Sequence, residues 1–212
     1  MRANLHRRRC FRVEDGELVT EYGVLALQGD WAAHGTILRE LGAHTCPVRT
    51  AADLARVDAL VIPGGESSAM LRLMEPENLS RRIRDRIVAG MAVLATCAGV
   101  ILLAENIQPP QPGLAVLDVE VVRNAYGRQL HSTVAEIVLT KELGKPRCME
   151  GVFIRAPRIV RVSSNVTVLG RWRDDPVLIR QGQILGATFH PELSADRRIH
   201  EMFMKAGEAG HG

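Results

Sequence analysis

The chain has 212 residues, of which 46% are apolar and 24% are charged. This balance is typical of a globular domain and excludes a disordered, collagen-like or coiled-coil protein. The net charge of +3 is unevenly placed, because five arginines and no acid fall within residues 1–12, which leaves 22 basic against 24 acidic side chains elsewhere. The body of the chain therefore lacks the composition of a nucleic-acid-binding protein.

The arginine-rich start predicts a disordered leader over residues 1–20, then a single domain over residues 21–206 and a flexible tail over residues 207–212. The four cysteines form no CxxC pair, which argues against a zinc knuckle and favours a reducing, cytoplasmic location. Residues 87–104 carry no charge over 18 positions, but glycines and polar residues interrupt the run, so we expect no membrane span.

In the first half of the chain, apolar runs alternate with helical patterns. Strands are expected at residues 23–27, 44–48, 59–62 and 91–95. Helices are expected from Asp30 to Gly42, from Ser80 to Gly90 with Val88 facing inward, and from Ala98 onward. This alternation predicts right-handed βαβ units and a parallel sheet covered on both faces.

A Pro-rich loop at residues 108–113 marks a change of character. Beyond it, strands are expected at residues 116–122, 134–139, 151–154, 159–162, 177–180 and 183–189, with a hairpin turn at Gln181 and Gly182. Ser194 is expected to cap a last helix. The predicted fold class is α/β: an open, mostly parallel doubly wound sheet with helices on both faces and added antiparallel strands in the second half.

Polar or small residues follow four of the expected strands. They form the segments 28–30, 64–68, 96–99 and 190–192. Because ligands of open α/β sheets bind in the crevice beyond the carboxyl ends of the strands, we expect these segments to line one cleft.

Cys97 falls between a buried strand and a helix, with Ala95 two positions before it and Gly99 two positions after it. This spacing of small residues is typical of a strained nucleophile elbow. At such an elbow the helix N-terminus favours the thiolate, and the backbone N–H of Ala98 can face a developing oxyanion. The alternative is a structural cysteine, the usual fate of Cys between apolar residues.

His190 follows an expected strand, and Pro191 favours an extended chain, so Glu192 can stand behind the imidazole or can orient it through a short turn. A histidine that faces a thiol and is held by a carboxylate has the base-and-orienter arrangement of a catalytic triad. Taken alone, His190 is more often a surface or core histidine and Glu192 a helix N-terminal acid. The elbow cysteine makes the triad the better interpretation.

Gly64 and Gly65 can bring backbone N–H groups close to an anion, although no phosphate-loop pattern is present. Glu66 beside them can bind the ammonium group of an amino-acid substrate. The alternative is a simple strand-to-helix turn capped by Ser67.

Six motifs occur in a characteristic order along the chain: LALQGD, PGGESS, TCAG, RNAYGRQ, FIRAP and HPEL. In this order they resemble the family of glutaminase subunits of pyridoxal 5'-phosphate synthase, which are class I (triad) glutamine amidotransferases. The resemblance covers about residues 23–205, and RNAYGRQ with FIRAP is its most specific part. The chain departs from the family's usual residues at positions 130–134 and at Ala33.

The resemblance implies hydrolysis of L-glutamine to L-glutamate and ammonia. It implies Cys97 as the nucleophile, His190 as general base and then acid, and Glu192 as the group that orients the imidazole. The backbone N–H groups of Gly65 and Ala98 are implied as oxyanion donors.

The family's glutamine-binding positions match Gly65, Glu66, Ser67, Arg123, Ile154 and Arg155. Gln28 is implied as a sensor of a docked partner. That partner is a (βα)8-barrel synthase subunit in a hetero-oligomeric complex, which takes up the ammonia. The resemblance implies no cofactor or metal in this chain.

Two other classes of protein stay open. One is another elbow-cysteine hydrolase of the same layout, such as a deglycase or a peptidase. In such an enzyme Arg123 and Arg155 would have no role. The other is a catalytically silent binding subunit whose cysteine is merely packed.

Overall fold

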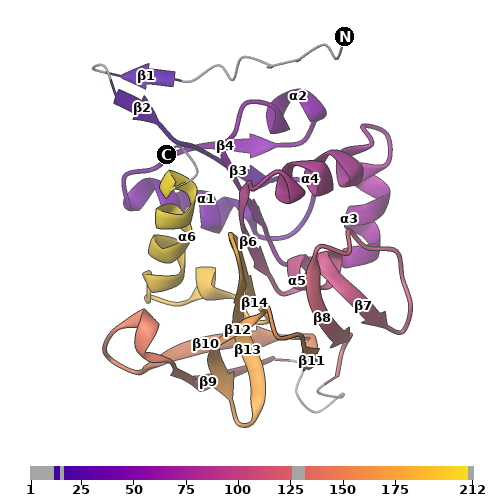
Figure 1. Cartoon of the computed structure of the whole chain (residues 1–212), viewed down its shortest axis with the longest axis vertical. Coiled ribbons are helices and arrows are strands. Elements are labelled where there is room, and N and C mark those ends of the chain that lie inside the picture. Colours follow the sequence, from indigo (N-terminus) through magenta and orange to yellow (C-terminus); the bar gives the residue numbers. More distant parts are fainter. Residues whose placement is uncertain (1–11, 15–16, 126–131, 210–212) are drawn as a thin grey trace.

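The computed structural model describes residues 12–14, 17–125 and 132–209. Its main element is a nine-stranded sheet in the order β10-β9-β12-β13-β14-β6-β5-β3-β4. Helices cover both faces of this sheet (Figure 1). The predicted α/β class is therefore confirmed.

One half of the sheet is parallel. Its strands are β3 (Glu21–Leu25), β4 (His44–Val48), β5 (Ala59–Ile62), β6 (Ala92–Thr96) and β14 (Ile184–Ala187). Every residue of β5 and β6 is buried, as expected for parallel strands covered on both faces. The chain leaves β3 first for β4 and then for β5 on the other side, so the β3–β5 boundary is the topological switch point.

The other half of the sheet is antiparallel. Its strands are β9 (Ser132–Leu139), β10 (Cys148–Ile154), β12 (Thr167–Trp172) and β13 (Asp175–Gln181). A separate three-stranded sheet contains β7 (Ala104–Gln108), β8 (Leu117–Val122) and β11 (Arg158–Val162). The antiparallel part is thus larger than the sequence pattern predicts.

The helices form two layers around the parallel strands (Figure 1). One layer holds α1 (Trp31–Glu40) and α6 (Arg198–Ala209). The opposite layer holds α2 (Ala51–Leu54), α3 (Ser67–Met74), α4 (Leu79–Val88) and α5 (Ala98–Leu103). The described part of the chain also contains the 3-10 helices η2 (Lys141–Leu143) and η3 (Pro191–Leu193). Among the described residues, no helix has both the length and the apolar character that a membrane crossing requires.

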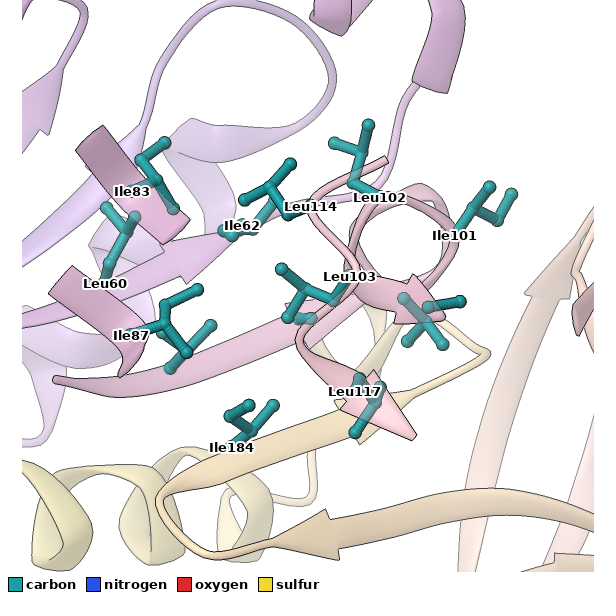
Figure 2. Packing of buried hydrophobic residues seen from close by; sticks show 14 of the residues in the cluster. Leu60, Ile62, Ile83, Ile87, Ile101, Leu102, Leu103, Leu114, Leu117 and Ile184 are labelled. Atoms are coloured by element: carbon teal, nitrogen blue, oxygen red, sulfur yellow. The ribbon is translucent and has the colours of Figure 1, made fainter. Parts of the chain in front are cut away.

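The period-two alternation of the strands divides the core between the two layers. Leu60 and Ile62 of β5 point into a cluster that includes Ile83 of α4, part of which is shown in Figure 2. Ala59 and Val61 point to the opposite face and join the cluster formed with α1 and α6. Both helical layers are therefore needed to cover the central strands.

Helix α4 differs from its prediction at both ends. It begins at Leu79, with Asn78 at the N-cap, rather than at Ser80. Val88 is 70% exposed, whereas the sequence predicts that it faces inward. The buried stripe ends at Ile87, and the next residue is rotated about 100° away from it.

Two local predictions near the end of the chain are also wrong. The Ser194 side chain does not cap the last helix: α6 begins at Arg198, whose N–H donates to Asp196 Oδ1 at 3.1 Å. The β13–β14 turn falls one residue later than predicted, because Gln181 pairs with Ile184. The two-residue turn is therefore 182–183.

The ends of the expected domain also contain structure. Arg12–Glu14 (β1) and Glu17–Val19 (β2) pair antiparallel, in contrast to the disorder predicted for the leader. Helix α6 reaches Ala209, and Gly207 is buried within it, so the described part of the expected tail is helical. Residues 1–11, 15–16 and 210–212 lie outside the described residues. The domain limits at 21 and 206 stay predictions.

Candidate active site

A cavity of about 220 Å³ lies beyond the carboxyl ends of β5 and β6, beside the switch point. All four polar segments singled out in the sequence contribute to its wall. The residues from these segments are Gly29, Asp30, Gly64, Gly65, Glu66, Ser67, Cys97, Ala98 and His190. The remaining lining residues are Ile101, Arg123, Asn124, Ile154 and Arg155.

Cys97 occupies the turn between β6 and α5 in a strained backbone conformation, with φ +47° and ψ −105°. Non-glycine residues rarely adopt such angles, so the surrounding packing must hold them. At Gly99 an added Cβ would lie 2.2 Å from the Ile62 carbonyl oxygen. The small residue predicted after the nucleophile is therefore required for α5 to approach β5.

The His190 ring lies between Cys97 and Glu192. Its Nδ1 is 2.7 Å from Glu192 Oε1, and the Cys97 side chain lies close enough to the ring to influence its pKa. The 3-10 turn η3, rather than an extended segment, brings the carboxylate back to the ring. At Gly64 an added Cβ would be 2.5 Å from His190 Cε1 and 3.4 Å from Cys97 Cβ, so a glycine leaves room for both side chains.

Burial and hydrogen bonding have opposite effects on the pKa values of His190 and Glu192. Burial alone would lower the pKa of His190, but its hydrogen bonds to Cys97 and Glu192 raise that pKa to about 10. Burial would raise the pKa of Glu192, yet its polar contacts with His190 and His34 hold it well below its ordinary value. The geometry therefore stabilises an imidazolium between a carboxylate and the cysteine sulfur.

The Gly64–Gly65 turn faces Cys97 across the cavity. Gly65 has φ +153°, a conformation that favours glycine. The neighbouring Glu66 N–H donates to Gln28 Oε1 at 3.0 Å, which ties this turn to the end of β3. Ala98, the first residue of α5, lines the same cavity, and the N-terminal N–H groups of a helix are free to bind an anion.

Glu66, rather than Ser67, caps helix α3. Its carboxylate accepts from the Ser68 N–H at 3.3 Å and from the Ser68 hydroxyl at 2.6 Å, and Arg123 lies 3.4 Å away. The hydrogen bonds from Ser68 lower the pKa of Glu66. The Ser67 hydroxyl instead donates to Gln111 Oε1 at 3.2 Å. Glu66 therefore presents a negative charge at the cavity wall.

Arg123 and Arg155 give the cavity wall two positive charges. Arg155 has φ +45°, and the carbonyl oxygen of Ile154 next to it lies 3.8 Å from Cys97 Sγ. Without the family resemblance, both would be interpreted as surface arginines. The RNAYGRQ motif continues into residues 126–129, which lie outside the described residues, as does His131.

Sequence reasoning missed three residues near this site. Asn124 lines the cavity with φ +51°, and a single sequence does not indicate either feature. His34 and His200 lie behind Glu192 in the described structure, on helices far apart in the chain. In the described residues no three His, Cys, Asp or Glu side chains are grouped as metal ligands.

Solved structures share this fold. One, described as the crystal structure of glutamine amidotransferase, is 41% identical with a TM-score of 0.81, over 88% of this chain and 98% of that one. PurLQS from Thermotoga maritima is similar in fold alone, with a TM-score of 0.70 at 14% identity, over 89% of this chain and 99% of that chain. The fold is that of the class I glutamine amidotransferases.

The chain belongs to the SNO glutamine amidotransferase family, which it matches over residues 24–209. It is 45% identical to the pyridoxal 5'-phosphate synthase subunit PdxT of Thermosipho africanus, over 86% of this chain and 96% of that protein. It is 47% identical to the PdxT subunit of Koribacter versatilis, over 89% and 96% respectively. The resemblance carried by the six motifs is confirmed.

Proposed function

We propose that this chain is the glutaminase subunit of a pyridoxal 5'-phosphate synthase, hydrolysing L-glutamine to L-glutamate and ammonia. One observation carries the proposal: the elbow cysteine Cys97 and His190 line the same cavity, and Glu192 holds the imidazole from behind at 2.7 Å. The relatives named as PdxT subunits support the same function.

The reaction needs a nucleophile and one proton carrier. The Cys97 thiolate attacks the side-chain amide carbon of glutamine, and the His190 imidazolium gives its proton to the departing ammonia. The neutral imidazole then takes a proton from water, whose oxygen attacks the γ-glutamyl thioester. Breakdown of the resulting adduct expels the Cys97 thiolate and releases glutamic acid with that oxygen, and its acid proton passes to solvent water. His190 keeps the proton that it took from water, so the thiolate–imidazolium pair is restored. Glu192 keeps Nδ1 protonated throughout.

Two backbone N–H groups are suited to the negative oxygen that develops during each attack. The Ala98 N–H stands at the start of α5, where the helix dipole also favours an anion. The second donor is the Gly65 N–H, after a local rearrangement of its turn. Gln28 holds the adjacent peptide, which supports a role for Gln28 in communicating the docking of the partner to this turn.

Opposite charges on the cavity wall suit an α-amino acid. Arg123 and Arg155 supply guanidinium forks for the α-carboxylate of glutamine. The charged carboxylate of Glu66 is suited to its ammonium group. Ser67 and Ile154 complete the proposed substrate-binding set. The two guanidinium groups and the carboxylate would have no role in binding a deglycase or peptidase substrate. The family match and the charges of the cavity wall therefore both favour glutamine as the substrate.

The partner we propose is a (βα)8-barrel synthase subunit, in a hetero-oligomeric complex, that receives the ammonia. The names of the PdxT relatives support a synthase partner, and the barrel is our inference. The mechanism uses no cofactor or metal in this chain. A cytoplasmic location agrees with the cysteine pattern.

The decisive experiment compares Cys97→Ala with Cys46→Ala, which alters a cysteine outside the cavity. In the complex, Cys97→Ala should abolish glutamine hydrolysis yet leave pyridoxal 5'-phosphate synthesis intact when ammonium salts are supplied. Cys46→Ala should keep both activities. Loss of ammonium-dependent synthesis in Cys97→Ala, or retained glutamine hydrolysis, overturns the proposal.

A further inference from the structure

A chain of polar contacts continues behind Glu192 into the core. While Oε1 of Glu192 meets His190, Oε2 lies 3.2 Å from Nε2 of His34 on α1. The other His34 nitrogen, Nδ1, lies 3.0 Å from Nε2 of His200 on α6. The side chains of His34 and Glu192 are 0% and 1% exposed, so bulk water cannot replace the contact between them. None of His34, His200 and Glu192 lines the cavity.

The contacts select one arrangement of protons. The charged Glu192 oxygen can only accept, so Nε2 of His34 must carry a hydrogen. Nδ1 of His34 is then an acceptor and receives the Nε2–H of His200. This leaves Nδ1 of His200 without a hydrogen, in agreement with its being buried and unpaired. The opposite tautomers would bury an unpaired N–H and turn a lone pair of His34 toward the carboxylate.

We propose that His34 is a positioning residue for glutamine hydrolysis: its Nε2–H holds the second oxygen of Glu192 and so fixes the carboxylate that orients His190. Oε2 makes no aligned hydrogen bond to any described group, and Nε2 of His34, 3.2 Å away, is the polar contact that the structure gives it. Thr96, the residue before the nucleophile, shares the Nε2 side of His34 with Glu192, and its hydroxyl forms a hydrogen bond with Nε2 at 3.3 Å. The polar contacts of the triad on the side away from the cavity therefore extend from Glu192 to helix α1.

The proposal has consequences for charge as well as for geometry. The titratable groups that face His34 are Glu192 from η3 and His200 from α6; Thr96 from β6 is uncharged, and Arg197 acts on His200 from just before α6. Removing the His34 donor leaves a buried carboxylate oxygen unpaired, which raises the pKa of Glu192 and weakens its hold on the imidazolium. His190 then gives up its proton at lower pH.

The experiment rests on the proposed glutaminase function and compares His34→Leu, His34→Gln and the wild-type chain in the synthase complex. In His34→Leu we expect kcat to fall by about 10- to 100-fold, the range that follows from losing the polar partner of a buried charge. The KM should stay within about twofold, because His34 does not line the cavity. The alkaline limb of the kcat profile should move to lower pH.

Rescue and packing controls separate positioning from loss of fold. His34→Gln keeps an N–H donor near the position of Nε2, so it should recover most of kcat and the wild-type pH profile, whereas His34→Asn should not. Leu38→Ala removes buried apolar atoms from the same helix and lowers stability without removing a polar contact of Glu192. It should keep both the kcat per folded molecule and the pH profile.

A second measurement does not depend on glutamine. The rate of alkylation of Cys97 by iodoacetamide, followed by mass spectrometry, reports how readily the thiol passes its proton to His190. Its pH midpoint should rise in His34→Leu and not in His34→Gln. An unchanged midpoint and an unchanged kcat profile in His34→Leu overturn the positioning role. Absence of glutamine hydrolysis in the wild-type complex overturns the glutaminase function instead, and the alkylation measurement still decides the role of His34. If His34→Leu does not fold, equal activity of His34→Gln and His34→Asn overturns the positioning role.

Discussion

Gln28 Oε1 accepts the backbone N–H of Glu66 at 3.0 Å, across the boundary where the strand order reverses. Gln28 follows β3, and Glu66 follows β5, so one side chain joins the two strands of the switch point. Gly65, our proposed oxyanion donor, is the residue directly before Glu66. The conformation of this peptide is therefore coupled to the position of Gln28.

Replacing Gln28 by Met removes this acceptor at nearly constant size. We expect kcat/KM of the partner-activated glutaminase to fall by about 3- to 10-fold, as for the loss of one hydrogen bond. The matched control is Gln181→Met, because Gln181 Oε1 also accepts a backbone N–H, that of Asp118 at 2.8 Å, but outside the cavity. Equal losses in both variants would show that general destabilisation, not the Gly65 turn, is responsible.

Arg123→Gln should act on substrate binding. The change removes a guanidinium from the cavity wall and frees Glu66 from an ion-pair contact of 3.4 Å. We expect the KM for glutamine to rise at least about tenfold with a smaller change in kcat, because a charge-assisted bond to the α-carboxylate is lost. Steady-state kinetics against the matched Arg158→Gln, which breaks a surface pair with Asp175, measures this. A KM change in Arg158→Gln of the same size contradicts the assignment.

Gly99→Ala should destabilise the elbow. The added methyl group would lie 2.2 Å from the backbone oxygen of Ile62, and a backbone atom cannot move aside as a flexible side chain can. Overpacking of this kind costs about 1–3 kcal/mol, which should appear as a lower midpoint of urea unfolding. In Gly35→Ala, the new Cβ meets only the end of Arg39 at 3.2 Å and lies in a helix, so no such loss is expected. An unchanged midpoint in Gly99→Ala would mean that β5 and α5 can separate.

Local signals in the sequence predict the parallel half of the fold well. The apolar runs of β4 and β5 match their predicted limits, and Asp30 accepts the Ala33 N–H at the start of α1 as a predicted cap should. The elbow at Cys97 is also predictable, because small residues at fixed spacing are a local requirement of the turn.

Contacts between distant segments could not be predicted in this way. Strand β12 carries register shifts around Gly170, which weaken its alternating pattern, and it was not expected. His34 and His200 are 166 positions apart, and no periodicity relates them. Their proximity depends on α1 and α6 packing on the same face of the sheet. Arg123 and Arg155 likewise could be assigned to substrate binding only through the family motifs.

The three described cysteines should differ in reactivity toward a chloroketone analogue of glutamine. Burial, together with nearby Glu21, raises the pKa of Cys46 to about 11, and a hydrogen bond to Glu136 raises that of Cys148. Both therefore stay protonated at neutral pH, whereas Cys97 has His190 as a proton acceptor. Peptide mapping should find the label on Cys97. Label on Cys46 or Cys148 at a similar rate would refute the elbow's special role.

The buried histidine pair predicts how stability depends on pH. Burial, and then the neighbouring His34, lowers the pKa of His200 to about 3, whereas an unfolded histidine titrates near its ordinary value of 6.5. Between these values the unfolded chain binds a proton that the folded chain does not, so this group makes the folded chain less stable as pH falls below 6.5. One such group gives a slope of up to about 1.4 kcal/mol per pH unit.

His200→Phe removes this titration, and its free energy of unfolding should therefore decline less steeply than that of the wild type between pH 6.5 and 4.5. Below pH 4.5 the titration of Glu192 also makes the folded chain less stable as pH falls, because its folded pKa is depressed. The slopes should therefore be compared above pH 4.5. Urea unfolding at several pH values measures the two slopes. The matched control is His44→Phe, because His44 is partly exposed on β4 and does not belong to the buried pair. If His44→Phe flattens the profile as much as His200→Phe does, the acid sensitivity does not arise behind Glu192.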